Sequence, residues 1–356
     1  MVLPQLYGFG IIRNAVKYDY PFQESFASLA RVTQKTHILA GDSSDETNQI
    51  LKEMAQKSST PIEISHSIWD TKLADGAQVL SVQTNLALQR LKSSLPSLSD
   101  SDWGFYLQAD EVLSEEDEDL LKRDLISAQE EGCDAISFRY LHFWQSHHAV
   151  AINKKWYPHE IRAIKLKSSI ESWGDAQSFR HHKKVYYSDV VIYHYGHVRK
   201  QEAYQEKKED ILKLYHAQEK LKKYQKREKK LDNITETLSY FGHHPAVMKE
   251  RIQRLEGNFE KKVKDKLYLL SSEAQKEELK DFLPRLMVKE LHLVSSLKDI
   301  PFSSYKNESI SLKPNMLSNF LLNEKTPLKM RSSFAQNFPI KMLLTFKLSE
   351  KGILLL

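Results

Sequence analysis

The chain has 356 residues, of which 41% are hydrophobic and 28% are charged, so it can form one large domain with appendages or two domains. Its formal net charge of +5 suits an anionic substrate or an anionic membrane surface, but it does not by itself indicate nucleic-acid binding. Cys133 is the only cysteine, which excludes an internal disulfide. The sequence has no run of roughly 18 apolar residues, and its start, MVLPQLYGFG, lacks the features of a secretory signal. We therefore expect a cytoplasmic protein that binds no nucleic acid and that can contact the inner face of the cell membrane peripherally.

Strand-like and helix-like segments alternate along the first 143 residues. This alternation predicts an α/β fold with a mostly parallel sheet flanked by helices. In such sheets ligands bind at the carboxyl ends of the strands, where the polar segments GDSSDET and QADE fall. Strands are predicted at residues 5–12, 37–40, 61–65, 102–107 and 135–143, and helices at 21–32, 47–56, 76–95 and 115–129.

The second half of the chain has a different character. Residues 149–198 are irregular and rich in His, Trp, Tyr and Arg, and residues 200–230 predict a long charged helix. That helix suits a solvated face or attraction to anionic lipid, and its interleaved acids argue against nucleic-acid binding. Another helix is expected from about Pro245, and periodicity weakens after about residue 281. We therefore divide the chain into a catalytic domain at 1–200, a helical extension at 201–280 and a poorly specified tail at 281–356.

The segment QADE places Asp110 at the end of a predicted strand. A carboxylate at this position can hold a divalent cation that neutralises charge on a diphosphate. The structural alternative is an acidic cluster in the first turn of the following helix, favoured by the helix dipole.

The segment GDSSDET also follows a predicted strand and opens a helix. Backbone N–H groups together with Asp42 or Asp45 could recognise a base or a ribose there. The alternative is a helix cap made by Ser44 or Asp45.

Two further segments, WYPHEIRAIK and SWGDAQSFRHH, combine carboxylates, arginines and aromatic residues. Arg162 and Arg180 are candidates to bind phosphate, which Arg contacts through two N–H groups. Glu160 and Asp175 are candidates for a general base that deprotonates a hydroxyl. The alternative is a buried Arg–carboxylate pair that anchors a loop.

The strand-like segment VVIYHYGHVRK carries His194, a candidate nitrogen ligand for a metal ion held by Asp110. The structural alternative is a hydrogen-bonded core histidine. The spacing of the other histidines does not resemble a zinc site.

Taken in order, the segments IIRNAVKYDYPFQES, HILAGDSSDET, SIWD, GAQVLSVQTNLAL, WGFYLQADEVL, WYPHEIRAIK, SWGDAQSFR and IYHYGHVRK resemble the bacterial family 2-like glycosyltransferases with a GT-A fold. The resemblance covers roughly residues 5–255. It implies a nucleotide-diphosphate sugar donor, a divalent metal (Mn²⁺ or Mg²⁺) and inverting transfer to a hydroxyl acceptor. The acceptors of the family are typically cell-envelope glycans or lipopolysaccharide intermediates, which can be lipid-linked.

The resemblance also assigns roles to single residues. Asp110 matches the last Asp of the family's DxD-like motif, and Gln108 stands where the first Asp is usual. Asn85 matches the Asn of an Arg–Asn pair in the helix before that motif, with Thr84 in place of the Arg. The residues expected to bind the donor, from the resemblance or from their position at strand ends, are Asp42, Ser43, Asp45, Asn85, Gln108 and Arg199. The expected metal ligands are Asp110 and His194. The catalytic candidates are Glu160, Asp175, Arg162 and Arg180, and Glu160 is preferred as the base.

Two other functions compete with a transferase. The first is a catalytically inactive sugar-nucleotide or glycan-binding protein on the same fold, which the departure at Gln108 would suit. The second is an interaction protein that acts through its basic helices and tail. The sequence has no nucleophile elbow, which argues against a hydrolase.

Overall fold

The structure is a computed structural model, and it describes most of the first 199 residues. Contacts divide the chain into two compact units, which we describe separately. The first unit comprises Met1–His142, Tyr157–Ile234 and His244–Glu260, and the second comprises Phe143–Trp156, Thr235–His243 and Lys261–Leu356. The described residues are 3–70, 73, 78–147, 149–151, 156–199, 203, 237–240 and 243–255, together with four short strands between 269 and 355. The predicted charged helix and most of the tail after 281 lie outside them, so the three-part division stays a prediction.

The first unit is built on a mixed sheet with the order β6-β8-β4-β1-β2-β3. β1 pairs in parallel with β2 and β4, and β2 pairs in parallel with β3, whereas β8 is antiparallel to β4 and β6. β5 and β11 pair with each other in antiparallel fashion, and β11 also pairs with β6. The bounds are β1 Gln5–Ile12, β2 Thr36–Ala40, β3 Ile62–His66, β4 Asp102–Tyr106, β5 Glu111–Leu113, β6 Ala135–Trp144 (of which residues 135–142 belong to this unit), β8 His159–Lys165 and β11 Val185–His197.

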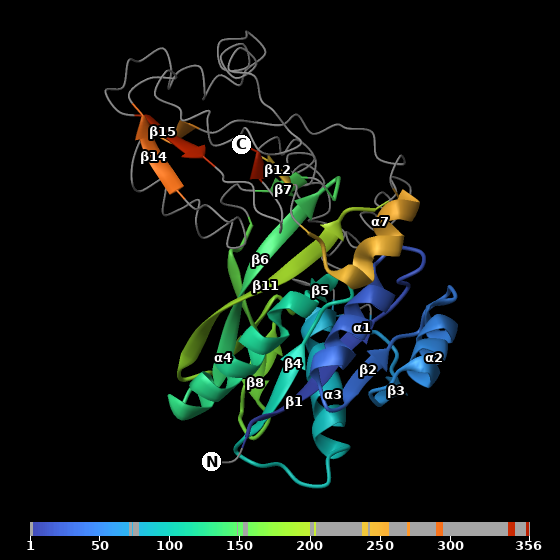
Figure 1. The fold of residues 1–356 in the computed structure, drawn as a ribbon. Coiled ribbons are helices and arrows are strands. Elements are labelled where there is room, and N and C mark those ends of the chain that lie inside the picture. The colour runs from blue at the N-terminus through green and yellow to red at the C-terminus, as the bar shows by residue number, and fades with distance from the viewer. Residues whose placement is uncertain are drawn as a thin grey trace. The chain divides into compact units, whose positions relative to one another are not determined.

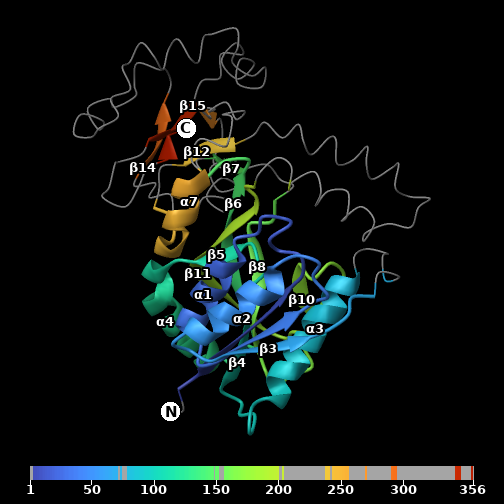
Figure 2. The same cartoon turned by 90° about the vertical axis from the view of Figure 1, so that its right-hand side faces the viewer.

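Helices cover both faces of this sheet, as Figures 1 and 2 show. Successive side chains of β1 alternate between the faces, so Leu6 and Ile12 pack beneath α1, α2 and α4, whereas Phe9 and Ile11 pack against α3. Gly10 lets α1 approach closely, because a Cβ atom there would lie 2.9 Å from the Phe26 ring. The helix bounds are α1 Phe22–Val32, α2 Thr47–Lys57, α3 Gln78–Ser93 and α4 Glu118–Glu130.

The fold class predicted from the alternating pattern is confirmed: the chain is α/β, with a mixed, mostly parallel sheet flanked by helices. All five strands and four helices predicted before residue 144 are present, and only the start of α4 is shifted by more than two residues, because the 3-10 turn Glu115–Asp117 precedes it. The short strand β5 was not predicted. It separates Asp110 from α4, so the interpretation of QADE as the acidic first turn of a helix is wrong.

The region expected to be irregular, 149–198, contains β8, the hairpin of β9 (Glu171–Trp173) and β10 (Ser178–Arg180), and β11. Of these strands only β11 was predicted, from the strand-like segment 190–200. The helix expected near Pro245 consists of the 3-10 turn Ala246–Met248 followed by α7, Lys249–Leu255. None of the helices in the described part of the chain is long and apolar enough to span a membrane.

The second unit is described only through its strands and a few neighbouring residues. β7 (Ala149–Ala151) pairs with β12 (Thr237–Tyr240), which also pairs with β16 (Leu354–Leu355). A separate antiparallel sheet has the order β13-β15-β14, formed by Leu269–Leu270, Lys341–Thr345 and Glu290–Val294.

Candidate active site at the carboxyl edge of the sheet

The parallel strands β1, β2, β3 and β4 bring four loops to one edge of the sheet. The loops after β1 and β2 are joined by hydrogen bonds between backbone and side chains. Asn14 N donates to Ser43 Oγ at 3.0 Å, Ser44 N donates to Asn14 Oδ1 at 2.8 Å, and Lys17 N donates to Asp45 Oδ2 at 2.7 Å. Asp45 also accepts from the Thr47 N–H at the start of α2, although the N-cap residue of that helix is Glu46, whose side chain forms no capping hydrogen bond. Ser43 and Asp45 therefore hold the backbone of these loops.

Asp42 joins three segments of the same edge. Its Oδ1 lies 3.0 Å from Arg13 Nε and accepts from the Trp69 backbone N–H at 3.2 Å. The Arg13 guanidinium lies 5.7 Å from the centroid of the Trp69 ring. The Asp42 side chain is 41% exposed, so it remains accessible to a ligand.

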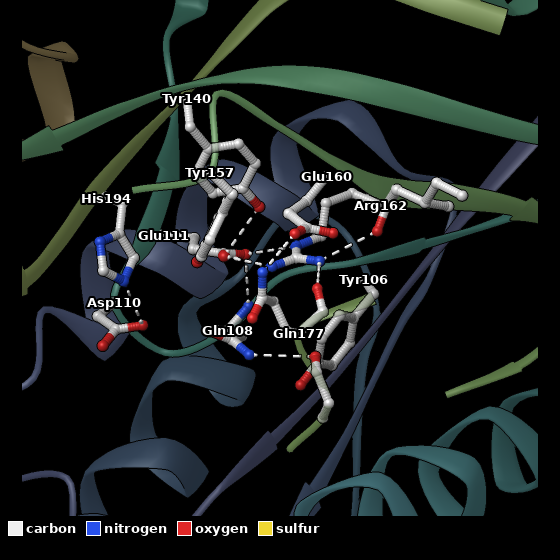
Figure 3. A network of polar contacts seen from close by, with 12 residues as sticks. Tyr106, Gln108, Asp110, Glu111, Tyr140, Tyr157, Glu160, Arg162, Gln177 and His194 are labelled. Carbon is white, nitrogen blue, oxygen red and sulfur yellow. Dashed lines mark hydrogen bonds and ion pairs between the residues drawn. The ribbon is translucent and has the colours of Figure 1, made fainter. Parts of the chain in front are cut away.

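Glu111 is the anchor of the QADE loop (Figure 3). Its carboxylate is completely buried and lies in a bidentate pair with Arg162, at 2.7 and 2.9 Å. The same carboxylate accepts from Tyr140 OH at 2.9 Å and from the Gln108 backbone N–H at 3.1 Å. Since Gln108 N–H, two residues before Asp110, is bonded to this group, the loop that carries Asp110 is held by a buried ion pair.

Arg162 therefore forms a buried Arg–carboxylate pair, which was the structural alternative to phosphate binding. Its guanidinium is fully buried and also donates to the Gln177 backbone oxygen at 2.5 Å. The rings of Tyr106 and Tyr140 lie 5.5 and 5.4 Å away. The structure leaves this guanidinium no open side toward a phosphate.

Asp110 lies opposite His194, with 3.9 Å between Oδ1 and Nε2 (Figure 3). The antiparallel pairing of β5 with β11 sets this proximity, because His194 is in register with Glu111. Asp110 Oδ2 lies 3.8 Å from Arg199 Nη2. The side chains of Asp110 and His194 are both nine-tenths buried. A Cβ atom at Gly196 would lie 2.7 Å from His194 Nε2 and 2.8 Å from Asp110 Oδ2. Only glycine fits against this pair.

His142 contacts the other side of the His194 ring. The two Nδ1 atoms are 3.1 Å apart, and His142 Nε2 lies 2.8 Å from the Tyr157 backbone oxygen. Burial, with the neighbouring His194 as the second cause, lowers the pKa of His142 well below its ordinary value.

Arg199 links β11 to the loop after β1. Its guanidinium donates to the backbone oxygens of Tyr18, at 2.8 Å, and Gly196, and it lies 4.6 Å from the centroid of the Tyr20 ring. Arg199, which was predicted to bind the donor, is therefore a cation that lies beside Asp110.

The candidate bases differ in environment. Glu160 is 9% exposed, and its Oε1 accepts from Gln177 Nε2 at 2.5 Å. Burial raises the pKa of the Glu160 carboxyl above its ordinary value, against the lowering effect of Arg162. Asp175 lies at the tip of the β9–β10 hairpin, where its Oδ1 accepts from the Gln177 backbone N–H at 3.3 Å. Arg180 is half exposed and pairs with Glu171 at 2.7 Å.

Asn85 and Gln108 hold the β9–β10 hairpin in place. The Asn85 amide donates to the Ser172 backbone oxygen and accepts from its N–H, both at 2.8 Å. Gln108 Nε2 donates to the Ala176 backbone oxygen at 3.3 Å. Both side chains thus form hydrogen bonds within the protein.

The Asp110–His194 pair fits a divalent cation that takes few ligands from protein. Within the residues that the structure describes, no group of three or more His, Cys, Asp or Glu side chains is arranged to hold a metal ion. The chain would therefore supply one carboxylate oxygen and one imidazole nitrogen, and Gly196 keeps side-chain atoms out of the space beside them. Substrate phosphates and water would complete the coordination of a cation such as Mn²⁺ or Mg²⁺.

Several residues of this site were not anticipated from the sequence, namely His142, Tyr140, Tyr157, Gln177 and Gly196. The segment RYLHF places Tyr140 and His142 two positions apart on one face of a strand, which is the one local signal that would have found them.

Comparisons with known proteins give only distant similarities. No protein-family model and no curated protein matches the sequence. Among solved structures, residues 1–349 of TarS from Staphylococcus aureus in complex with UDP match 58% of this chain and 64% of that one, with 14% identity and a TM-score of 0.36. A longer TarS structure matches at 14% identity, 58% and 39% coverage and a TM-score of 0.33. Mannose-6-phosphate isomerase from Helicobacter pylori matches at 12% identity, 46% and 62% coverage and a TM-score of 0.26. Each match spans less than two thirds of the other structure, and at these values none assigns an activity to this chain.

Proposed function

We propose that this chain is a metal-assisted, inverting glycosyltransferase that moves a sugar from a nucleotide-diphosphate donor to a hydroxyl acceptor. The observation that carries the proposal is the Asp110–His194 pair at the carboxyl edge of an α/β sheet, anchored by the buried Glu111–Arg162 pair. The eight ordered segments that resemble family 2-like glycosyltransferases support the same function.

Asp110 and His194 would hold the divalent cation. When bound, the cation would neutralise negative charge on the donor diphosphate. Because one of the two ligands is an imidazole, we expect Mn²⁺ to bind better than Mg²⁺, which prefers oxygen ligands.

Arg199 is the cation of this chain that we assign to the leaving diphosphate. It lies beside Asp110, whereas Arg162 is paired with Glu111 and Arg180 is paired with Glu171. Because the Arg199 side chain is itself only 1% exposed, it would act on the diphosphate through its charge rather than by direct contact. A positively charged group fixed before the reaction stabilises negative charge that develops on the leaving group. Asp42, with Arg13, would contact the donor's nucleoside part.

Glu160 is the general base that we prefer for the acceptor hydroxyl. Burial raises the pKa of the Glu160 carboxyl, so its carboxylate is a stronger base than that of an exposed glutamate. Asp175 remains the alternative base. The proposed acceptor is a glycan or a lipid-linked intermediate of the cell envelope, and the proposed location is peripheral to the membrane. Both of these proposals rest on the resemblance alone.

The test is a transfer assay with purified chain, a panel of nucleotide sugars and Mn²⁺, in which released nucleoside diphosphate is measured. We expect release from one donor class and a loss of two orders of magnitude or more in Asp110→Asn. Asp119→Asn is the matched control, because the Asp119 side chain is 85% exposed on α4.

Two results would redirect the assignment. Full activity of Asp110→Asn with a confirmed donor would refute the metal site. Donor binding without any turnover would instead assign the catalytically inactive binding protein.

A further inference from the structure

The two buried histidines His142 and His194 form a hydrogen-bonded pair between neighbouring strands. His142 is 1% exposed and His194 is 7% exposed, and β6 pairs with β11. Their ring centroids are 4.9 Å apart, and the two Nδ1 atoms approach to 3.1 Å. A hydrogen bond between two imidazole nitrogens requires that one of them carries the proton and the other presents a lone pair.

The backbone decides which nitrogen of His142 carries its proton. His142 Nε2 lies 2.8 Å from the Tyr157 backbone oxygen, and a carbonyl oxygen can only accept. The proton of His142 is therefore on Nε2. In the neutral ring this single proton leaves Nδ1 with a lone pair that faces His194.

This arrangement fixes the form of His194 as well. An imidazole that binds a metal ion through Nε2 is neutral and carries its single proton on Nδ1, and His194 Nδ1 faces the lone pair of His142 Nδ1 at 3.1 Å, where that proton can be donated. His194 Nε2 then presents its lone pair on the side of Asp110 Oδ1, 3.9 Å away. An imidazole that faces a carboxylate would otherwise favour the opposite form, with the proton on Nε2 and directed at the carboxylate oxygen.

We propose that His142 is a positioning residue that sets the tautomer of His194, so that His194 Nε2 is available as a metal ligand beside Asp110. This inference rests on the metal site of the proposed function and deepens it. Residues that hydrogen-bond the second nitrogen of a histidine ligand commonly fix its tautomer and orientation.

The rotation of the His142 ring is fixed by two tyrosines. Tyr140 stacks on it at 5.4 Å with an interplanar angle of 22°, and Tyr157 meets it edge-on at 4.6 Å and 90°. The ring therefore keeps both nitrogens directed at their partners.

The first test is nitrogen NMR of the histidine side chains in the metal-free protein at pH about 8, above the ordinary histidine pKa of about 6.5. We expect the Nδ1–H form for His194 and the Nε2–H form for His142. The reverse form of His194 would overturn the inference, whatever the transfer assay shows.

The second test is a Mn²⁺ titration followed by electron paramagnetic resonance, without nucleotide. We expect His142→Leu to weaken Mn²⁺ binding about 10- to 100-fold. His37→Leu is the matched control, because His37 is also a buried histidine of the first unit but bonds Ser65 on β3. We expect its Mn²⁺ affinity to equal that of the wild type.

The outcomes separate this inference from the proposed function. Unchanged Mn²⁺ affinity in folded His142→Leu would overturn the role of His142 and leave the transferase standing. Absence of Mn²⁺ binding in the wild-type protein would overturn the metal role of His194, and the donor specificity found in the transfer assay would then stand on its own.

Discussion

Replacing Arg162 by methionine removes one half of a completely buried ion pair. Arg162 and Glu111 are joined at 2.7 and 2.9 Å, and neither side chain is exposed to solvent. Methionine fills much of the same volume but leaves the Glu111 carboxylate without its cation in an interior lined by Tyr106 and Tyr140.

The cost follows from this burial. Removing one partner of a buried ion pair typically destabilises a protein by about 3–5 kcal/mol, since an uncompensated charge remains inside. We expect Arg162→Met to lower the free energy of unfolding by that amount, measured by urea denaturation. Arg180→Met is the matched control: the Arg180–Glu171 pair is about half exposed, and we expect a change below about 1 kcal/mol.

A double variant tests the stated cause. In Glu111→Gln/Arg162→Met the buried charge is gone, so we expect the double variant to be at least about 1 kcal/mol more stable than Arg162→Met. A cost below about 1 kcal/mol for Arg162→Met, or additive effects of the two substitutions, would refute the reasoning.

Three further predictions address the site and its surroundings. Gly196→Ala places a Cβ atom about where it would contact His194 Nε2 and Asp110 Oδ2, so we expect Mn²⁺ affinity to fall at least about tenfold; unchanged affinity would contradict the site. Glu160→Gln should abolish the acidic limb of the activity profile, which in the wild type should lie above the ordinary glutamate pKa of about 4.3 because burial raises the pKa of Glu160; a limb that persists would assign the base elsewhere. Burial lowers the pKa of His37, so its contribution to stability is present above about pH 6.5 and is lost as the pH falls further; the unfolding free energy of His37→Leu should therefore decline less between pH 7 and 5, and parallel declines would contradict the shift.

The helices and strands before residue 144, except β5, were predictable because their signals are local. The segments QLYGFGII and THILA are apolar runs of strand length, and residues 78–93 repeat apolar positions with helical spacing. β5 was missed because it has only three residues, and its partner strand β11 comes some 80 residues later in the chain.

The site was predictable to the extent that residue types identify ligands. Asp110 and His194 were selected as a pair from the sequence, and the structure places them 3.9 Å apart. For Arg162 the sequence left phosphate binding and a buried Arg–carboxylate pair as alternatives, because nothing near it in the sequence shows its partner. Glu111 lies 51 residues away, and only the fold brings the two together in the interior.

The central claim is that the carboxyl edge of this sheet binds a nucleotide diphosphate through a cation on Asp110. The most direct measurement is a thermal-shift screen of nucleoside diphosphates, with and without Mn²⁺, on wild-type and Asp110→Asn protein. A ligand at 100 times its Kd stabilises the folded state by about 2.7 kcal/mol, which raises the Tm of a unit of this size by several degrees. We predict a Mn²⁺-dependent shift with one nucleotide that is lost in Asp110→Asn. A well-folded wild-type protein that shows no shift with any nucleotide, or a shift that survives in Asp110→Asn, would contradict the account.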